Sequence, residues 1–122
     1  MKLTNSEIYN YANALLNAFA ENDRMLPIKI NFYLQKNKKT LVELAKDIEA
    51  NRTAIARTYG TPDETGTQFS IDPEKIPVVE KELEDLFSLE QEVNIYKINI
   101  DSFDEDLMLT TAQMEAMMFM ID

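Results

Sequence analysis

The chain has 122 residues, of which 45% are hydrophobic and 28% charged, and this composition predicts a single domain over residues 1–122 with one core. It contains no cysteine and no histidine, which excludes disulfides, thiolate metal sites, a thiol nucleophile and a histidine base. No apolar run approaches the roughly 18 residues of a membrane span. The N-terminus MKLTNSEIYN lacks a signal-peptide core, so we expect a cytoplasmic protein without membrane contact.

The net charge of −10 is distributed unevenly along the chain. Residues 1–61 carry nine Lys/Arg against six Asp/Glu, whereas residues 62–122 carry three against sixteen. An acidic half of this kind repels phosphates and attracts basic groups, which argues against direct nucleic-acid binding and favours a protein partner. The alternative is that the acidic surface serves only solubility.

A first helix is predicted to begin after Thr4, because Thr4 and Glu7 have the spacing of a capping box and Leu3 is placed to pack on Ile8. Its apolar stripe consists of Ile8, Ala12, Leu15 and Phe19, and it ends near Glu21, Asn22 and Asp23. The short connection that follows predicts antiparallel packing against the next helix. Because the first helix is about half as long, we expect it to leave part of that helix uncovered.

The longest predicted element is one helix over residues 27–59, about 50 Å long, which ends before Gly60 and Pro62. Its apolar residues repeat every seven positions, as in two helices packed side by side. One position holds Leu34, Leu41, Ile48 and Ile55; the other holds Ile30, Asn37, Leu44 and Asn51. The asparagines either set the register of a partner helix or lie at the rim of the contact. Residues 28–34 also alternate as a strand does, but residues 35–39 lack a turn signal, which favours one continuous helix.

The middle of the chain predicts two strands separated by a third helix. Phe69–Ile71 alternates as a short strand, and the helix is predicted from Pro77 to near Leu89. Its apolar face is Val79, Leu83, Leu86 and Phe87, and its solvent face is Glu80, Glu82, Glu84 and Asp85. Residues 92–100 are rich in β-branched side chains and predict a strand that pairs with Phe69–Ile71, in a direction that the sequence leaves open.

A closing helix is predicted after Thr110, because Thr110 and Gln113 repeat the capping-box pattern of the N-terminus. It carries four methionines, at positions 114, 117, 118 and 120. A stripe of this kind usually faces the core, although methionines also form adaptable binding surfaces.

No residue pattern in the chain indicates catalysis, so we predict a protein that is not an enzyme and needs no cofactor or metal. The strongest candidate for metal ligands is the acidic loop that holds Asp101, Asp104, Glu105 and Asp106. It lacks the glycine and the closing glutamate of an EF-hand, and a hydrated acidic loop is the favoured interpretation.

Four segments together resemble a group of small proteins encoded by phages and prophages of Gram-positive bacteria. They are LPIKINFYLQKNKK, the YG that ends the long helix, EKELEDLFSLEQEVNIYKINI and LTTAQMEAMMFMID. The group is one of unknown function, so the resemblance carries over no functional residue. It implies a phage accessory protein that acts in the infected cytoplasm or in virion assembly.

The sequence therefore predicts a mainly helical α+β fold, with a long central helix packed by shorter helices and a small two-stranded sheet. We predict a protein-binding role and a homo-dimer in which Leu41 and Ile48 of the long helix form the contact. The alternative function is an acidic mimic of nucleic acid that inhibits a host defence nuclease. Its candidate contact residues are Glu84, Asp85, Asp104, Glu105 and Asp106.

Overall fold

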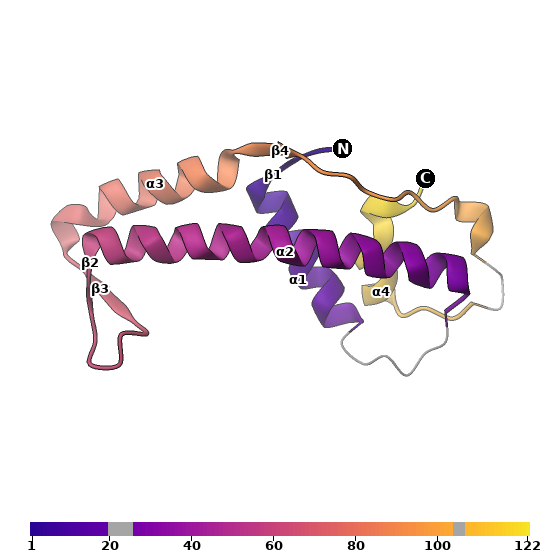
Figure 1. Cartoon of the computed structure of the whole chain (residues 1–122), viewed down its shortest axis with the longest axis horizontal. Helices are drawn as coiled ribbons and strands as arrows, with labels where there is room; N and C mark the ends of the chain where they lie inside the picture. The colour runs from indigo at the N-terminus through magenta and orange to yellow at the C-terminus, as the bar shows by residue number, and fades with distance from the viewer. Residues whose placement is uncertain (20–25, 104–106) are drawn as a thin grey trace.

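The computed structural model describes residues 1–19, 26–103 and 107–122, and its fold is α+β and mainly helical. A long central helix, α2 (Ile28–Tyr59), runs the length of the molecule (Figure 1). The shorter helices α1 (Asn5–Ala18), α3 (Ile76–Ser88) and α4 (Thr111–Met117) are arranged around it. The continuous helix predicted through residues 28–34 is confirmed.

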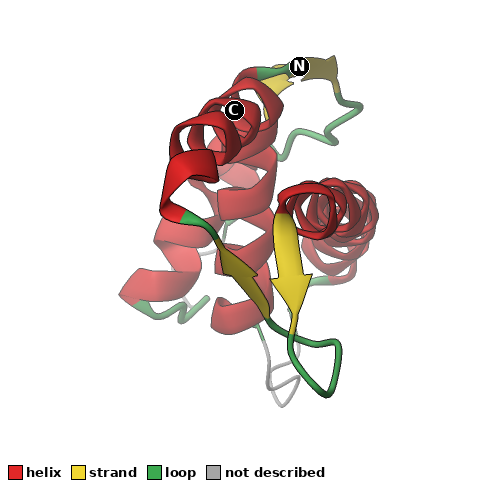
Figure 2. Ribbon diagram, turned by 90° about the vertical axis from the view of Figure 1, so that its left-hand side faces the viewer, coloured by secondary structure: helices red, strands yellow, loops and turns green. Residues whose placement is uncertain are grey.

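Two small antiparallel sheets complete the fold in the described residues. Strand β1 (Lys2–Thr4) pairs with β4 (Glu90–Glu92), and β2 (Gly60–Pro62) pairs with β3 (Phe69–Ile71). The strand predicted at Phe69–Ile71 is thus confirmed, but its predicted pairing with residues 92–100 is wrong. Its partner is the segment that directly follows α2, and together they form a hairpin that projects at the end of the helix (Figure 2).

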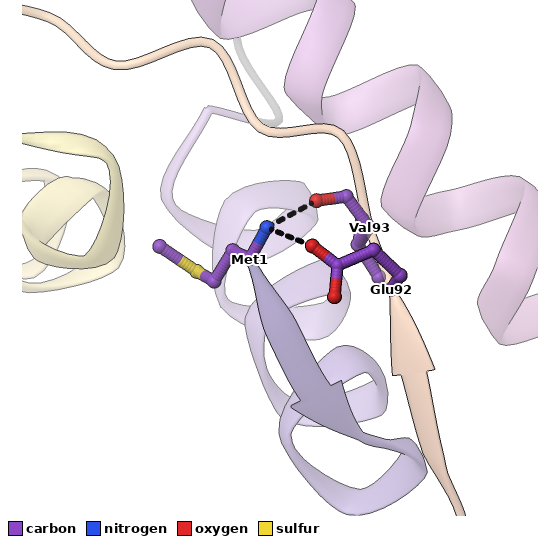
Figure 3. A network of polar contacts seen from close by, with 3 residues as sticks. All are labelled: Met1, Glu92 and Val93. Atoms are coloured by element: carbon purple, nitrogen blue, oxygen red, sulfur yellow. Dashed lines mark hydrogen bonds and ion pairs between the residues drawn. The ribbon is translucent and has the colours of Figure 1, made fainter.

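The first sheet continues at the chain's first residue. The Met1 amine lies 3.0 Å from Glu92 Oε1 and donates to the Val93 carbonyl oxygen at 2.9 Å (Figure 3). The Val93 N–H donates in turn to the Met1 carbonyl oxygen at 2.8 Å. These contacts hold the segment that leaves β4 against the start of the chain.

Both predicted capping boxes are present. The Thr4 hydroxyl accepts from the Glu7 N–H, and the Thr110 hydroxyl accepts from the Gln113 N–H, each at 3.1 Å. Helix α1 crosses behind α2 obliquely instead of lying alongside it (Figure 1). It therefore covers a middle portion of α2. Its predicted end near residues 21–23 lies outside the described residues.

Residues 93–99 are extended but form no regular strand, contrary to prediction. The Asn37 side chain on α2 accepts from the Tyr96 N–H at 2.8 Å and donates to the Tyr96 carbonyl oxygen at 2.9 Å. The Ile98 N–H donates to Met120, and the Ile98 carbonyl oxygen accepts from Asp122, both at 2.8 Å. The Asn37 side chain and the C-terminal residues Met120 and Asp122 thus bond backbone groups that a neighbouring strand would otherwise bond.

We call the body the part of the molecule made of residues 1–19, residues 28–48 of α2, strand β4, residues 93–103 and residues 107–122. Every buried side chain of the described residues lies in the body. The largest of them are Ile8, Leu15, Ile30, Leu34, Leu41, Ile98, Met117 and Met120. Of the four methionines, Met117 and Met120 are therefore core residues, while Met114 and Met118 are exposed.

We call the arm the part made of residues 49–59 of α2, the β2–β3 hairpin and α3. No residue from 49 to 92 is buried. The arm extends away from α1 and α4, and α3 runs back along α2 in the opposite direction (Figure 1). The arm is therefore a pair of antiparallel helices, joined through the β2–β3 hairpin, that has no buried core of its own.

Candidate binding groove on the arm

Helix α3 is strongly amphipathic but only partly covered. Pro77 lies in its first turn, and its apolar residues recur at the helical spacing on the side that faces α2. These residues, Val79, Leu83, Leu86 and Phe87, are all half-buried, and none is buried. The acidic residues Glu80, Glu82, Glu84 and Asp85 are exposed, as predicted.

A groove of about 370 Å³ opens between α2 and α3. We call it the arm groove; its lining comprises Asn51, Ala54, Ile55, Thr58 and Tyr59 of α2, and Glu82, Asp85, Leu86 and Leu89 of the α3 side. Small side chains on the α2 wall allow another backbone to approach closely. Leu89 is 58% exposed, so part of the apolar surface is free for a partner.

The arm groove is fixed at both ends by hydrogen bonds. At the outer end the Tyr59 hydroxyl contacts Glu82 Oε1 at 3.3 Å. At the body end Asn5 Nδ2 donates to the Leu86 carbonyl oxygen at 2.8 Å, and Asn5 Oδ1 accepts from Gln91 Nε2 at 2.7 Å. Because Asn5 is buried, these bonds hold the end of α3 in one position relative to α1.

Two carboxylates give the arm groove a negative rim. Glu82 and Asp85 line it, and the nearby cation Lys81 lies 3.8 Å from Asp85 as a weak, exposed pair. The groove therefore offers an apolar floor with acidic edges. That combination suits a partner segment with one or two apolar side chains and a lysine or arginine beside them.

A second hollow, about 470 Å³, lies between α1 and α4. Its lining is mostly small or neutral: Asn10, Tyr11, Ala14, Asn17, Ala18, Ala112, Glu115 and Ala116. It presents one carboxylate and few apolar side chains beyond alanine. This composition gives a partner less to bind than the arm groove does.

The structure separates the residues predicted to form partner contacts. Leu41 and Ile48 lie in the core of the single chain, 0% and 2% exposed, which corrects their assignment to a dimer contact. Asn37 is also buried and sets the register of an internal segment, whereas Asn51 is exposed and donates to the Asp47 carbonyl oxygen. Glu84 and Asp85 are exposed on α3, while Asp104, Glu105 and Asp106 lie outside the described residues.

The apolar residues of the arm groove were not predicted as contacts. The available signal was that α3 has a full apolar face but only the far part of α2 to pack on.

Among the described residues, no cluster of three or more acidic side chains is arranged to hold a metal ion. Within the same ranges, no helix has the length and hydropathy needed to cross a membrane. Comparison with known protein families, curated proteins and solved structures found no match to this chain.

Proposed function

We propose that this chain is a non-enzymatic protein-binding module that takes its partner on the arm. The observation that carries the proposal is the arm groove, an apolar surface with an acidic rim on a helical hairpin without a buried residue. A partner that covers these half-exposed apolar side chains removes their surface from water, which stabilises the complex. The partner we expect is a protein segment with apolar anchors and a basic residue.

The resemblance to small phage and prophage proteins supports an accessory role in an infected Gram-positive cell. We propose the cytoplasm as its place of action, with the virion as the alternative. Neighbouring tail and holin genes would favour a virion role, and neighbouring early genes would favour a host protein as partner. We also propose that the chain forms a homo-dimer, through a surface other than Leu41 and Ile48.

Site-specific photo-crosslinking in a Gram-positive host tests the binding role. A photoreactive amino acid at position 89 should crosslink to one protein, identified by mass spectrometry, whereas the same group at Met118, an exposed position on the body, should not. The purified partner should bind the unmodified protein and lose about tenfold or more in affinity to Leu89→Asp. Equal crosslinking from both positions, or unchanged affinity for Leu89→Asp, would refute the proposal.

Mimicry of nucleic acid is the second candidate function. It is favoured by the exposed acidic face of α3, where Glu80 and Glu84 lie one turn apart. Part of the acidic run is neutralised, because Glu90 pairs with Lys2 at 3.2 Å and Glu92 with the Met1 amine at 3.0 Å. A mimic should bind a defence nuclease less tightly as salt increases, and Glu80→Gln with Glu84→Gln should weaken that binding. Salt-independent binding would exclude it; Glu64→Gln, an exposed residue of the hairpin loop, is the control.

A further inference from the structure

The N-terminal part of α2 presents an exposed apolar pair on its free side. Ile28 is 82% exposed and Phe32, one turn later, is 51% exposed. In a regular helix Phe32 lies about 160° around the axis from the buried Ile30, so the pair points away from the core. An isoleucine and a phenylalanine exposed together on one helix face indicate a contact surface.

Lysines surround this apolar pair. Residues 26–42 contain four lysines and no acidic residue, although the whole chain has a net charge of −10. The Lys36 ammonium lies 5.5 Å from the centre of the Phe32 ring. We call Ile28, Lys29, Phe32 and Lys36 the basic ridge. It has the chemistry expected of a partner for the arm groove, namely apolar anchors with cations beside them.

We propose that the basic ridge of one copy occupies the arm groove of a second copy. This inference rests on the proposed binding role of the arm and names a partner for that same groove. Its basis is complementarity within one sequence: an apolar and acidic groove at one end of α2, and an apolar and basic ridge at the other. Each chain therefore carries both halves of the contact.

The helical geometry of α2 allows two such contacts at once. Ala54 in the groove wall follows Phe32 by 22 positions, which is about 33 Å along the helix and only about 40° around it. Phe32 and Ala54 therefore lie near the same side of α2, at the edge of the groove wall. Two copies related by a two-fold axis near residue 43, with their α2 helices antiparallel, bring each Phe32 to the Ala54 edge of the other copy's groove.

This arrangement has a defined register. Phe32 of one copy lies opposite Ala54 of the other, so a large apolar side chain meets a small one. Asp47 lies opposite Lys39, which is a pair of opposite charges. Two contacts of the register are like-charged: Lys29 lies opposite Arg57, and Glu43 meets its own copy at the axis.

Light scattering over a concentration series tests the proposal. The unmodified chain should have twice the mass of its 14.1 kDa monomer at about 100 µM. Phe32→Asp should give a monomer at the same concentration. Met118→Asp, a matched change at a residue of the body that is 62% exposed, should leave the dimer intact.

Charge variants test the register itself. Lys39→Glu should weaken the dimer by about tenfold, and adding Asp47→Lys to the same chain should restore much of that loss. Glu43→Gln should strengthen it, because it removes the like-charged contact at the axis. A strictly monomeric protein, or a dimer that survives both Phe32→Asp and Lys39→Glu, would overturn the proposal. Either result leaves the crosslinking test at position 89 to decide the binding role of the arm separately.

Discussion

The body and the arm are built on the same helix but are held together differently. In the body, α2 is covered by α1 and by the extended residues 93–99, and Leu41 and Ile48 are buried. In the arm, α2 is covered by α3 and, at its end, by the β2–β3 hairpin, and Ile55, which continues the same heptad position, is only half-buried. The comparison shows that a regular apolar repeat does not determine how much of a helix is covered.

Polar side chains mark the same contrast. The two buried polar residues of the described chain are Asn5 and Asn37, and both belong to the body. Asn37 binds both backbone groups of Tyr96, and Asn5 binds the carbonyl oxygen of Leu86 at the base of the arm. Buried amides with all their partners specify one arrangement of the elements around them. The arm itself has no buried polar residue.

The largest expected difference is between two leucine truncations. Leu41→Ala removes a fully buried side chain and should lower the free energy of unfolding by about 3 kcal/mol. Leu83→Ala removes a half-buried side chain of α3 and should cost about 1 kcal/mol. Urea unfolding measures both, and equal losses would show that the arm is packed as tightly as the body.

The two asparagines of α2 provide the next comparison. Asn37→Ala leaves the Tyr96 N–H and carbonyl oxygen without their partner inside the body, which should cost about 2–3 kcal/mol. Asn51→Ala removes an exposed bond within the helix and should change stability by less than about 0.5 kcal/mol. Thermal or urea unfolding of the pair checks this; similar values for both would contradict an internal role for Asn37.

Gly60→Ala should weaken the arm and leave the body unchanged. A Cβ at this position would lie 2.6 Å from the Ala56 carbonyl oxygen and 2.9 Å from Ile71 Cδ1, so the end of α2 or the hairpin must shift. We expect a loss of about 1–2 kcal/mol, seen as faster hydrogen exchange of amides in α3 and the hairpin. Faster exchange in α1 as well would mean that the arm and the body open together. Thr61→Ala, at an exposed neighbour, is the control.

The smallest expected effect is a pH dependence of the hairpin loop. The Thr65 hydroxyl donates to Asp63 and, together with backbone hydrogen bonds that include the Thr67 N–H, holds the pKa of that carboxyl below its usual value. Because the folded pKa is lowered, the loop is fully stabilised above about pH 4, and this contribution is lost as the pH falls through the lower folded pKa. NMR of the Thr65 and Thr67 amides should show this change below pH 4, and Asp63→Asn should abolish it. A change centred above pH 5 would contradict the assignment.

The sequence by itself determined the features that depend on neighbours within a few residues. Both capping boxes, the continuous α2, the end of α2 at Tyr59 and the acidic face of α3 are present as predicted. Each rests on spacings within a helix or on the limits that proline and glycine place on the backbone. These local rules act before any long-range contact forms.

Only the tertiary structure decided which surfaces cover one another. The β-branched residues 92–100 predicted a strand, yet the Asn37 side chain and the C-terminus satisfy the backbone of this segment in place of another strand. The heptad repeat predicted a second copy at Leu41 and Ile48, yet the chain covers both residues with its own segments. Apolar burial and hydrogen bonding are satisfied equally well by any partner of the right shape. The choice between an internal and an external partner therefore depends on the path of the whole chain.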